Sequence, residues 1–212
     1  MSDTPISLYK LAIQVVPDEQ NLRSVRWDTK LVHRLEQLEG ACSDLSDAAN
    51  FLDRMKLADD YITLDALATA AVVRYARCFK SGVRNSLHSL IGWPENMSSR
   101  ELHDRVLAIR DRHVSHAVNE FETNSAMLWI RDDESGHITS VSTATRTAIA
   151  ISYEEALELT ALCGAWHSAA RDAIWLEQNE LIKSARELPV DVVLRMPSGS
   201  KETSPDPLRR RQ

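Results

Sequence analysis

The stretch that decides the fold is LVHRLEQLEGACSDLSDAANFL, residues 31–52. Its apolar residues recur at alternating spacings of four and three, which is typical of a helix that packs along a nearly parallel partner. We therefore predict a long helix over residues 25–56, in which Gly40 marks a kink or a short break. The apolar stripe consists of Leu31, Leu35, Leu38, Cys42, Leu45, Ala49 and Leu52.

Three further helices are indicated downstream, at about residues 64–80, 99–119 and 152–188. Ser98 and Glu101 are spaced as a capping box before the second of them. Ser152 and Glu155 repeat this spacing before the last one. The last helix is expected to bury the stripe of Leu159, Leu162, Trp166, Ala169, Ala173 and Leu176.

The period of the sequence changes between the third and the fourth helix. The segments AMLWIRDD and HITSVSTATRTAIAI flank a turn signal, and together they predict a β-hairpin at about residues 126–150. The predicted fold class is mainly α, an antiparallel bundle of about four long helices with this hairpin inserted before the last helix. We expect an N-terminal segment (1–24), a helical domain (25–190) and a disordered tail (197–212).

The bulk composition is that of a soluble chain with one sizeable core, 212 residues long and 43% hydrophobic. No stretch approaches the roughly 18–20 apolar residues of a membrane span, and no basic leader precedes an apolar block. We therefore expect a cytoplasmic protein that is not associated with a membrane. Cys42, Cys78 and Cys163 lie far apart, which favours buried free thiols over disulfides or a zinc site.

Charge is distributed unevenly along the chain. The net charge of −6 argues against a general nucleic-acid-binding protein. Residues 74–112 nevertheless contain eight arginines and lysines against four aspartates and glutamates. A basic middle region of this kind is compatible with a focused anion site, and equally with a solvated helix face that carries many charges.

The third helix concentrates titratable side chains in IRDRHVSHA, residues 109–117. At about 100° per residue, His113 falls in the middle of the apolar stripe, whereas Arg110 and His116 flank this stripe on opposite sides. Arg112 lies beyond His116. The stripe consists of Leu102, Val106, Ile109 and Ala117.

These residue types suffice for metal-independent RNA cleavage. A histidine transfers the proton of the 2′-hydroxyl or of the leaving oxygen, and an arginine stabilises the phosphate charge in the transition state. Asp111 is next to Arg110 in sequence, and its carboxylate can orient the guanidinium. The candidate RNA-binding residues are Arg112, Arg77, Lys80 and Arg84. The same pattern is also that of a core histidine next to surface ion pairs, and this alternative stays open.

Other chemistries find less support. The sequence contains no Glu-x-x-His, which a di-metal site in a helical bundle requires. A zinc site on His113, His116 and Glu120 has only a weak spacing signal, and we expect no metal. No nucleophile elbow or glycine-rich phosphate loop is present. A ligand-binding bundle would have its pocket near Trp93, Trp129 and Trp166.

The motif resembles that of the HEPN superfamily, written R-x(4-6)-H and carried by a late helix of an all-helical domain. Here Arg110 is followed by the polar Asp111, and five residues separate Arg110 from His116. The sequence IRDRHVSHA is similar to the motif of abortive-infection HEPN proteins of bacteria. The resemblance covers roughly residues 25–188.

The resemblance implies a homodimer in which two motif helices meet in one cleft. It implies a ribonuclease without metal or other cofactor, in a toxin–antitoxin or phage-defence setting with an antitoxin or operon partner. His116 would then be the acid or base, Arg110 the phosphate clamp and Asp111 its positioning residue. His113 adds an alternative pairing with Arg110. Members that have lost activity imply the alternative, a non-catalytic helical dimer that binds RNA or protein.

Overall fold

The computed structural model describes residues 25–80, 85–94, 99–114, 122–131, 138–148 and 151–198. The described chain is mainly helical, with a two-stranded antiparallel sheet before the last helices, which confirms the predicted fold class. The chain forms two compact units, one of residues 29–187 and one of the two ends of the chain. The predicted N-terminal segment and residues 199–212 of the predicted tail lie outside the described residues.

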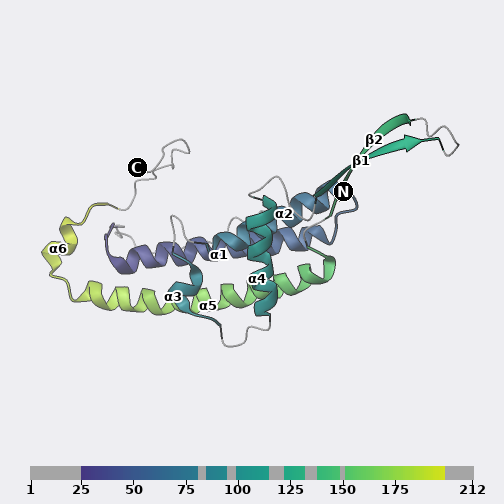
Figure 1. Cartoon of the computed structure of the whole chain (residues 1–212). Coiled ribbons are helices and arrows are strands. Elements are labelled where there is room, and N and C mark those ends of the chain that lie inside the picture. The colour runs from purple at the N-terminus through teal and green to yellow at the C-terminus, as the bar shows by residue number, and fades with distance from the viewer. Residues whose placement is uncertain are drawn as a thin grey trace, which may run out of the picture. The chain divides into compact units, whose positions relative to one another are not determined.

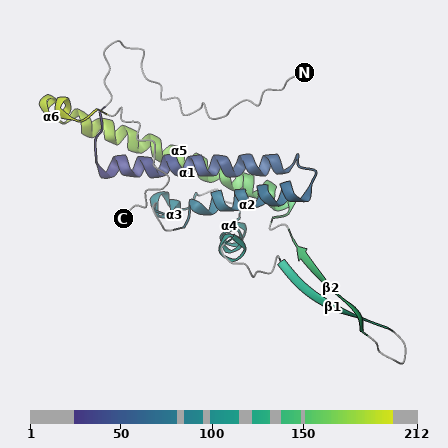
Figure 2. The same cartoon turned by 90° about the horizontal axis from the view of Figure 1, so that it is seen from above.

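The larger unit is built around α1 (Lys30–Met55). This helix packs against α2 (Tyr61–Arg77) and α5 (Tyr153–Arg186), which run alongside it in Figures 1 and 2. The helix α4 (Arg100–Ile109) crosses this layer, since it is seen lengthwise in Figure 1 and end-on in Figure 2. The short helix α3 (Leu87–Ile91) contacts α1 and α5.

The seam of α1 follows the predicted stripe. Leu38, Leu45 and Leu52 are completely buried against the neighbouring helices. The helix begins after Thr29, whose side-chain oxygen accepts a hydrogen bond from the backbone N–H of the third following residue over 3.2 Å. It continues without a break through Gly40, because packing on two neighbours outweighs the cost of about 1 kcal/mol of a glycine in a helix.

The predicted caps are correct for α5 and wrong by one residue for α4. Ser152 Oγ accepts from the N–H of Glu155, and a Glu155 carboxylate oxygen accepts from the N–H of Ser152, at 3.2 and 2.9 Å. In α4 the cap is Ser99 rather than Ser98, because it is Ser99 Oγ that accepts from the N–H of Leu102, over 3.2 Å.

The buried side of α5 deviates from prediction toward its C-terminal end. Leu176 is 61% exposed, and Ala170 and Ile174 are buried in place of the predicted positions. The predicted stripe has an average spacing of 3.4 residues, whereas a straight helix turns every 3.6, so the predicted stripe drifts off the buried face along a helix of 34 residues.

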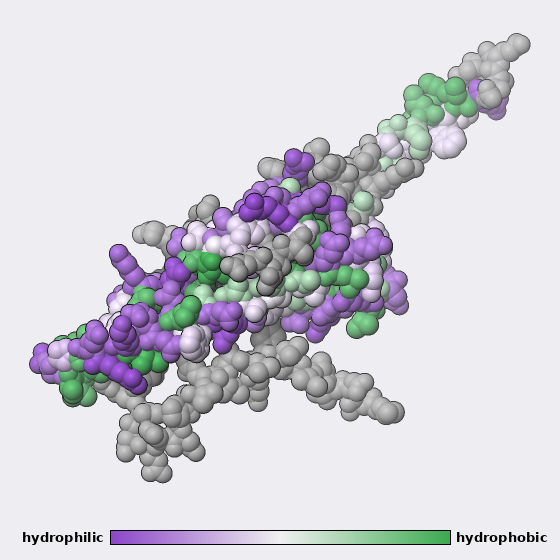
Figure 3. Space-filling model, turned by 90° about the horizontal axis from the view of Figure 1, so that it is seen from below, coloured by the Kyte–Doolittle hydropathy of each residue, from purple (hydrophilic) through white to green (hydrophobic). Residues whose placement is uncertain are grey.

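The hairpin consists of β1 (Glu122–Ile130) and β2 (Ile138–Thr147), close to the predicted residues 126–150. Leu128 lies opposite Val141, and the register shifts between Trp129 and Ile130. Neither strand packs extensively on a helix in the described part of the chain. Hydrophobic residues therefore remain exposed along the hairpin, at the upper right of Figure 3.

The smaller unit contains α6 (Val190–Arg195). Val25 forms an isolated antiparallel bridge with Ser198, and the N–H of Arg26 donates to the carbonyl oxygen of Pro197 over 2.8 Å. Among the helices described in either unit, none has the length and apolar character needed to cross a membrane.

Candidate active site

The basic sequence at the end of α4 forms a π-helix, η2 (Arg110–Val114). It follows directly after Ile109, the last buried residue of the α4 stripe. Hydrogen bonds in a π-helix join residues i and i+5, so a turn contains more residues than in an α-helix. The angular positions predicted at about 100° per residue therefore do not hold within this segment. Single π turns of this kind are frequent at functional sites.

Arg110, Asp111 and Lys80 form a chain of ion pairs at the surface. Arg110 Nη1 donates to Asp111 Oδ1 over 3.0 Å, and Lys80 Nζ donates to Asp111 Oδ2 over 2.5 Å. These hydrogen bonds, first that from Lys80, stabilise the carboxylate and hold the pKa of Asp111 below its ordinary value. Asp111 thus connects η2 to the end of α2, which lies 31 residues earlier.

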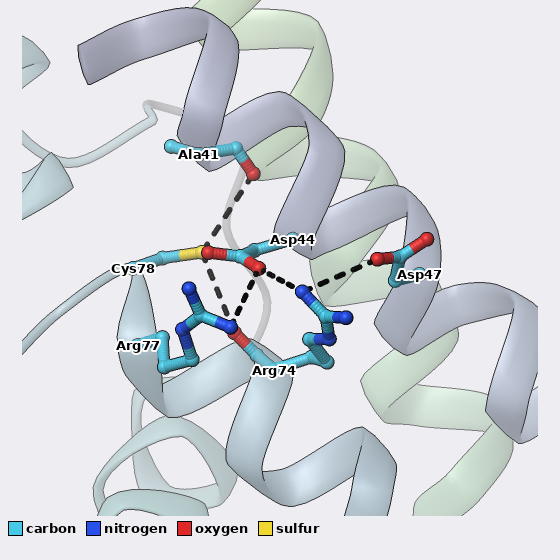
Figure 4. A network of polar contacts seen from close by, with 6 residues as sticks. All are labelled: Ala41, Asp44, Asp47, Arg74, Arg77 and Cys78. Atoms are coloured by element: carbon cyan, nitrogen blue, oxygen red, sulfur yellow. Dashed lines mark hydrogen bonds and ion pairs between the residues drawn. The ribbon is translucent and has the colours of Figure 1, made fainter. Parts of the chain in front are cut away.

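A second network lies one turn back along α2 (Figure 4). Arg74 Nη1 and Arg77 Nη1 contact the same oxygen of Asp44 in α1, at 2.8 and 3.5 Å. Arg74 also lies 3.4 Å from the carboxylate of Asp47. Because the guanidinium of Arg77 is turned toward α1, this candidate RNA-binding residue contributes to helix packing, and the network fixes the last turn of α2 ahead of Lys80.

The remaining predicted site residues are described only in part. Arg112 is exposed in η2. For His113 the structure describes the backbone and not the side chain, and His116 and Arg84 lie outside the described residues. The structure therefore brings together Lys80, Arg110 and Asp111, which are two cations and the carboxylate between them.

A buried histidine that the sequence analysis did not single out lies in α4. His103 is 4% exposed, and its Nδ1 is 2.9 Å from the hydroxyl oxygen of Tyr75. Aromatic rings surround it, with centroids at 4.6 Å for Phe79 and 4.9 Å for Trp93. Burial lowers the pKa of His103, so the imidazole is neutral at neutral pH.

The sequence did contain a signal for this histidine. His103 lies three residues before Val106 and six before Ile109, so it borders the apolar stripe of α4. The third tryptophan predicted for this region does not belong to the cluster. Trp93 and Trp166 pack at 5.3 Å, whereas Trp129 lies in the hairpin, 56% exposed, with Nε1 donating to Ser142 over 2.8 Å.

Among the hollows in the surface of the described chain are two that neither Arg110 nor Asp111 lines. One of 460 Å³ lies between the end of α1 and the start of α5, with the Arg105–Glu155 ion pair in its wall. The other, of 270 Å³, lies beside the first turns of α1. The ion-pair chain of Lys80, Asp111 and Arg110 lies at the surface, and its side chains are 36%, 45% and 39% exposed.

The cysteines are free and buried, as predicted. Burial raises the pKa of Cys42 to about 11 and that of Cys163 to about 12, so both are protonated and unreactive thiols at neutral pH. Within the described ranges, no group of three or more histidine, cysteine or acidic side chains is arranged to hold a metal ion.

Comparison of the chain with protein-family models, with curated proteins and with solved structures found no match. A guanidinium held by a carboxylate, with a lysine ammonium on the same carboxylate, is suited to bind an anion with two oxygens.

Proposed function

We propose that this chain is a HEPN-like, metal-independent endoribonuclease that acts as a homodimer. The observation that supports the proposal is the contact of Lys80 and Arg110 with the two oxygens of Asp111, at 2.5 and 3.0 Å. Two cations that contact the two oxygens of one carboxylate are spaced to contact two oxygens of a phosphate group in the same way. The guanidinium also stays charged at every physiological pH.

In the proposed reaction the ribose 2′-oxygen attacks the adjacent phosphorus, and the 5′-oxygen of the next nucleotide leaves. Arg110 stabilises the charge that develops on the phosphate oxygens. His116, or His113 in the alternative pairing, accepts the 2′-hydroxyl proton or gives a proton to the leaving oxygen. The products are a 2′,3′-cyclic phosphate and a 5′-hydroxyl end, and no metal ion takes part.

The proposed setting is a bacterial defence or toxin–antitoxin system in the cytoplasm. A ribonuclease that cleaves cellular RNA has to be restrained in the cell that makes it, which is the reason to expect an antitoxin or another operon partner. The HEPN resemblance of the motif supports this setting. The surface position of Arg110 and Asp111, whose side chains are 39% and 45% exposed, leaves the motif accessible to RNA.

The proposal is tested by incubating the purified full-length protein with labelled RNA in the presence of a chelator. Cleavage to 5′-hydroxyl products is expected, and 2′-deoxy substitution at the cleaved nucleotide is expected to abolish it. Arg110→Ala and His116→Ala are each expected to lower the rate about a hundredfold or more. His113→Ala shows which histidine transfers the proton.

Matched controls lie outside the motif. Arg171 is a surface arginine whose Nη1 contacts Glu39 at 3.1 Å, and His33 is an exposed histidine near Glu36. Arg171→Ala and His33→Ala are expected to leave the cleavage rate unchanged. Activity that is equal in wild type, Arg110→Ala and His116→Ala would contradict the proposal, because a contaminating nuclease gives that result.

A second candidate function is a non-catalytic helical dimer that binds RNA or protein. It is favoured by the same contact, because a guanidinium paired with a carboxylate is also the arrangement of a structural ion pair. In that case no variant cleaves RNA, and Arg110→Ala lowers the melting temperature or the dimer population. If the chain is an endoribonuclease, Arg110→Ala is expected to lose cleavage while its melting temperature and its dimer population stay unchanged.

A further inference from the structure

Two aspartates of this protein each contact two cations, and they differ in exposure. Asp44 contacts two arginines of α2, and its side chain is 3% exposed. Asp111 contacts Lys80 and Arg110, and its side chain is 45% exposed. A ligand in solution can therefore reach the position that Asp111 occupies between its two cations, whereas the position that Asp44 occupies is closed to it.

The network around Asp44 and the cluster around Asp111 also differ in the charged side chains that form them. The buried network contains two arginines and two aspartates, Asp44 and Asp47, and is neutral. The cluster of Lys80, Arg110 and Asp111 contains two cations and one carboxylate. A phosphodiester carries one negative charge, as the carboxylate of Asp111 does, so it can take the place of that carboxylate between the two cations without changing the charge of the cluster.

We propose that Lys80 and Arg110 form a binding site for one phosphodiester group of RNA, and that the carboxylate of Asp111 occupies the anion position when RNA is absent. Lys80 and Arg110 already contact the two oxygens of a single carboxylate. A phosphodiester presents two non-bridging oxygens to the same donors, and arginine and lysine are the usual phosphate ligands of proteins. The identity of the ligand as RNA rests on the proposed function.

Displacement of Asp111 costs little, because ion pairs between half-exposed side chains contribute only a fraction of a kcal/mol in water. The lowered pKa of Asp111 keeps its carboxylate charged at neutral pH, so release of the cations is driven by the ligand and not by a proton. In this role Asp111 competes with RNA. A residue that only orients Arg110 would instead support RNA binding, and the two roles predict opposite effects of Asp111→Asn.

The site is tested by fluorescence anisotropy of a labelled 2′-O-methyl oligonucleotide, which blocks cleavage, titrated with the full-length protein over a series of salt concentrations. Asp111→Asn is expected to raise the affinity roughly three- to fivefold. Lys80→Gln and Arg110→Gln are expected to lower it. Each is also expected to reduce the slope of log K against log salt by about 0.7, the value for one phosphate contact with a single strand.

The chain offers a matched pair outside the site. Lys56 Nζ lies 2.7 Å from Asp53, at the end of α1, so Asp53→Asn and Lys56→Gln make the same changes of charge elsewhere. Both are expected to leave the affinity nearly unchanged. An equal or weaker affinity of Asp111→Asn overturns the proposal, and so does an increase that Asp53→Asn reproduces, or the absence of binding by every variant. Circular dichroism of each variant confirms that the helices are formed.

Cleavage of an unmodified oligonucleotide is measured alongside. The expected affinity pattern without cleavage supports the phosphodiester site and contradicts the ribonuclease. Cleavage that depends on Arg110, without the affinity pattern, supports the ribonuclease and overturns the role of Asp111 as a competing anion.

Discussion

The hydroxyl oxygen of Tyr75 lies 2.9 Å from Nδ1 of His103, inside the aromatic cluster that joins α2 to α4. Both residues are buried, and this contact is a polar one between α2 and the helix that carries the basic motif. A hydrogen bond at this depth is costly to break, because the remaining group has no access to water.

Tyr75→Phe is therefore expected to lower the free energy of unfolding by about 1–3 kcal/mol, the cost of a buried polar group without its partner. Urea denaturation followed by circular dichroism measures the loss. Tyr61→Phe is the control, since Tyr61 is 46% exposed and its change is expected to be close to zero. Equal midpoints for the two variants would show that the Tyr75–His103 contact contributes nothing.

The buried histidine also predicts a loss of stability in mild acid. Burial lowers the pKa of His103 and that of His167 below their ordinary value of 6.5. Below pH 6.5 the unfolded chain therefore binds protons on these histidines that the folded chain does not bind. The free energy of unfolding consequently falls as the pH decreases from about 6.5. The contribution of these groups is complete above pH 6.5.

Urea midpoints at pH 7.5 and pH 5 measure this effect. That interval lies above the ordinary pKa of 3.8 of an aspartate, so the loss of stability from Asp111, which has the same direction and sets in near that pKa, stays small. His103→Leu is expected to reduce the difference between the two midpoints, and His33→Ala to leave it unchanged. A wild-type midpoint that does not fall toward pH 5 would be inconsistent with a neutral buried His103.

The features that sequence predicted correctly are local ones. The stripe of α1, the capping box at Ser152 and the hairpin each depend on residues within a few positions of one another. Periodicity failed where a small error accumulates, as at Leu176 in the long helix α5. The spacing of about 100° per residue also does not apply within η2, because a turn of a π-helix contains more residues than a turn of an α-helix.

The candidate site shows the same limit. Arg110 and Asp111 are neighbours in sequence, so their contact could be predicted from the sequence alone. The contact between Lys80 and Asp111 spans 31 residues and depends on the crossing of α4 with the end of α2. The Tyr75–His103 hydrogen bond depends on the same crossing, which no local spacing encodes.

The hairpin predicts a contrast in stability between apolar residues. Leu128 and Val141 face one another across the strands, and each is 63% exposed, whereas Leu45 is completely buried in α1. Leu45→Ala is expected to destabilise the helical unit by about 2–5 kcal/mol through the cavity it leaves. Leu128→Ala and Val141→Ala are expected to change it by less than about 0.5 kcal/mol. Thermal unfolding monitored at 222 nm compares the three. A large loss for Val141→Ala would mean that something covers the hairpin in solution.

Because the carboxylate of Asp44 is buried, replacing its arginine partners is expected to cost more stability than replacing Asp44 itself. Replacing both arginines, in Arg74→Met with Arg77→Met, leaves a carboxylate in the interior without its guanidinium partners, and a loss of about 3 kcal/mol or more is expected. Asp44→Asn alone is expected to cost less, because the arginine side chains are 36% and 47% exposed and water can solvate them.

Combining the three substitutions makes the test independent of helix propensity. When the arginines are already replaced, Asp44→Asn is expected to recover part of the lost stability, since it removes the unpaired buried charge. Urea denaturation of the four proteins closes the cycle. If Asp44→Asn were instead destabilising by the same amount with and without the arginines, the carboxylate would gain nothing from them, and the last turn of α2 ahead of Lys80 would be held by apolar packing alone.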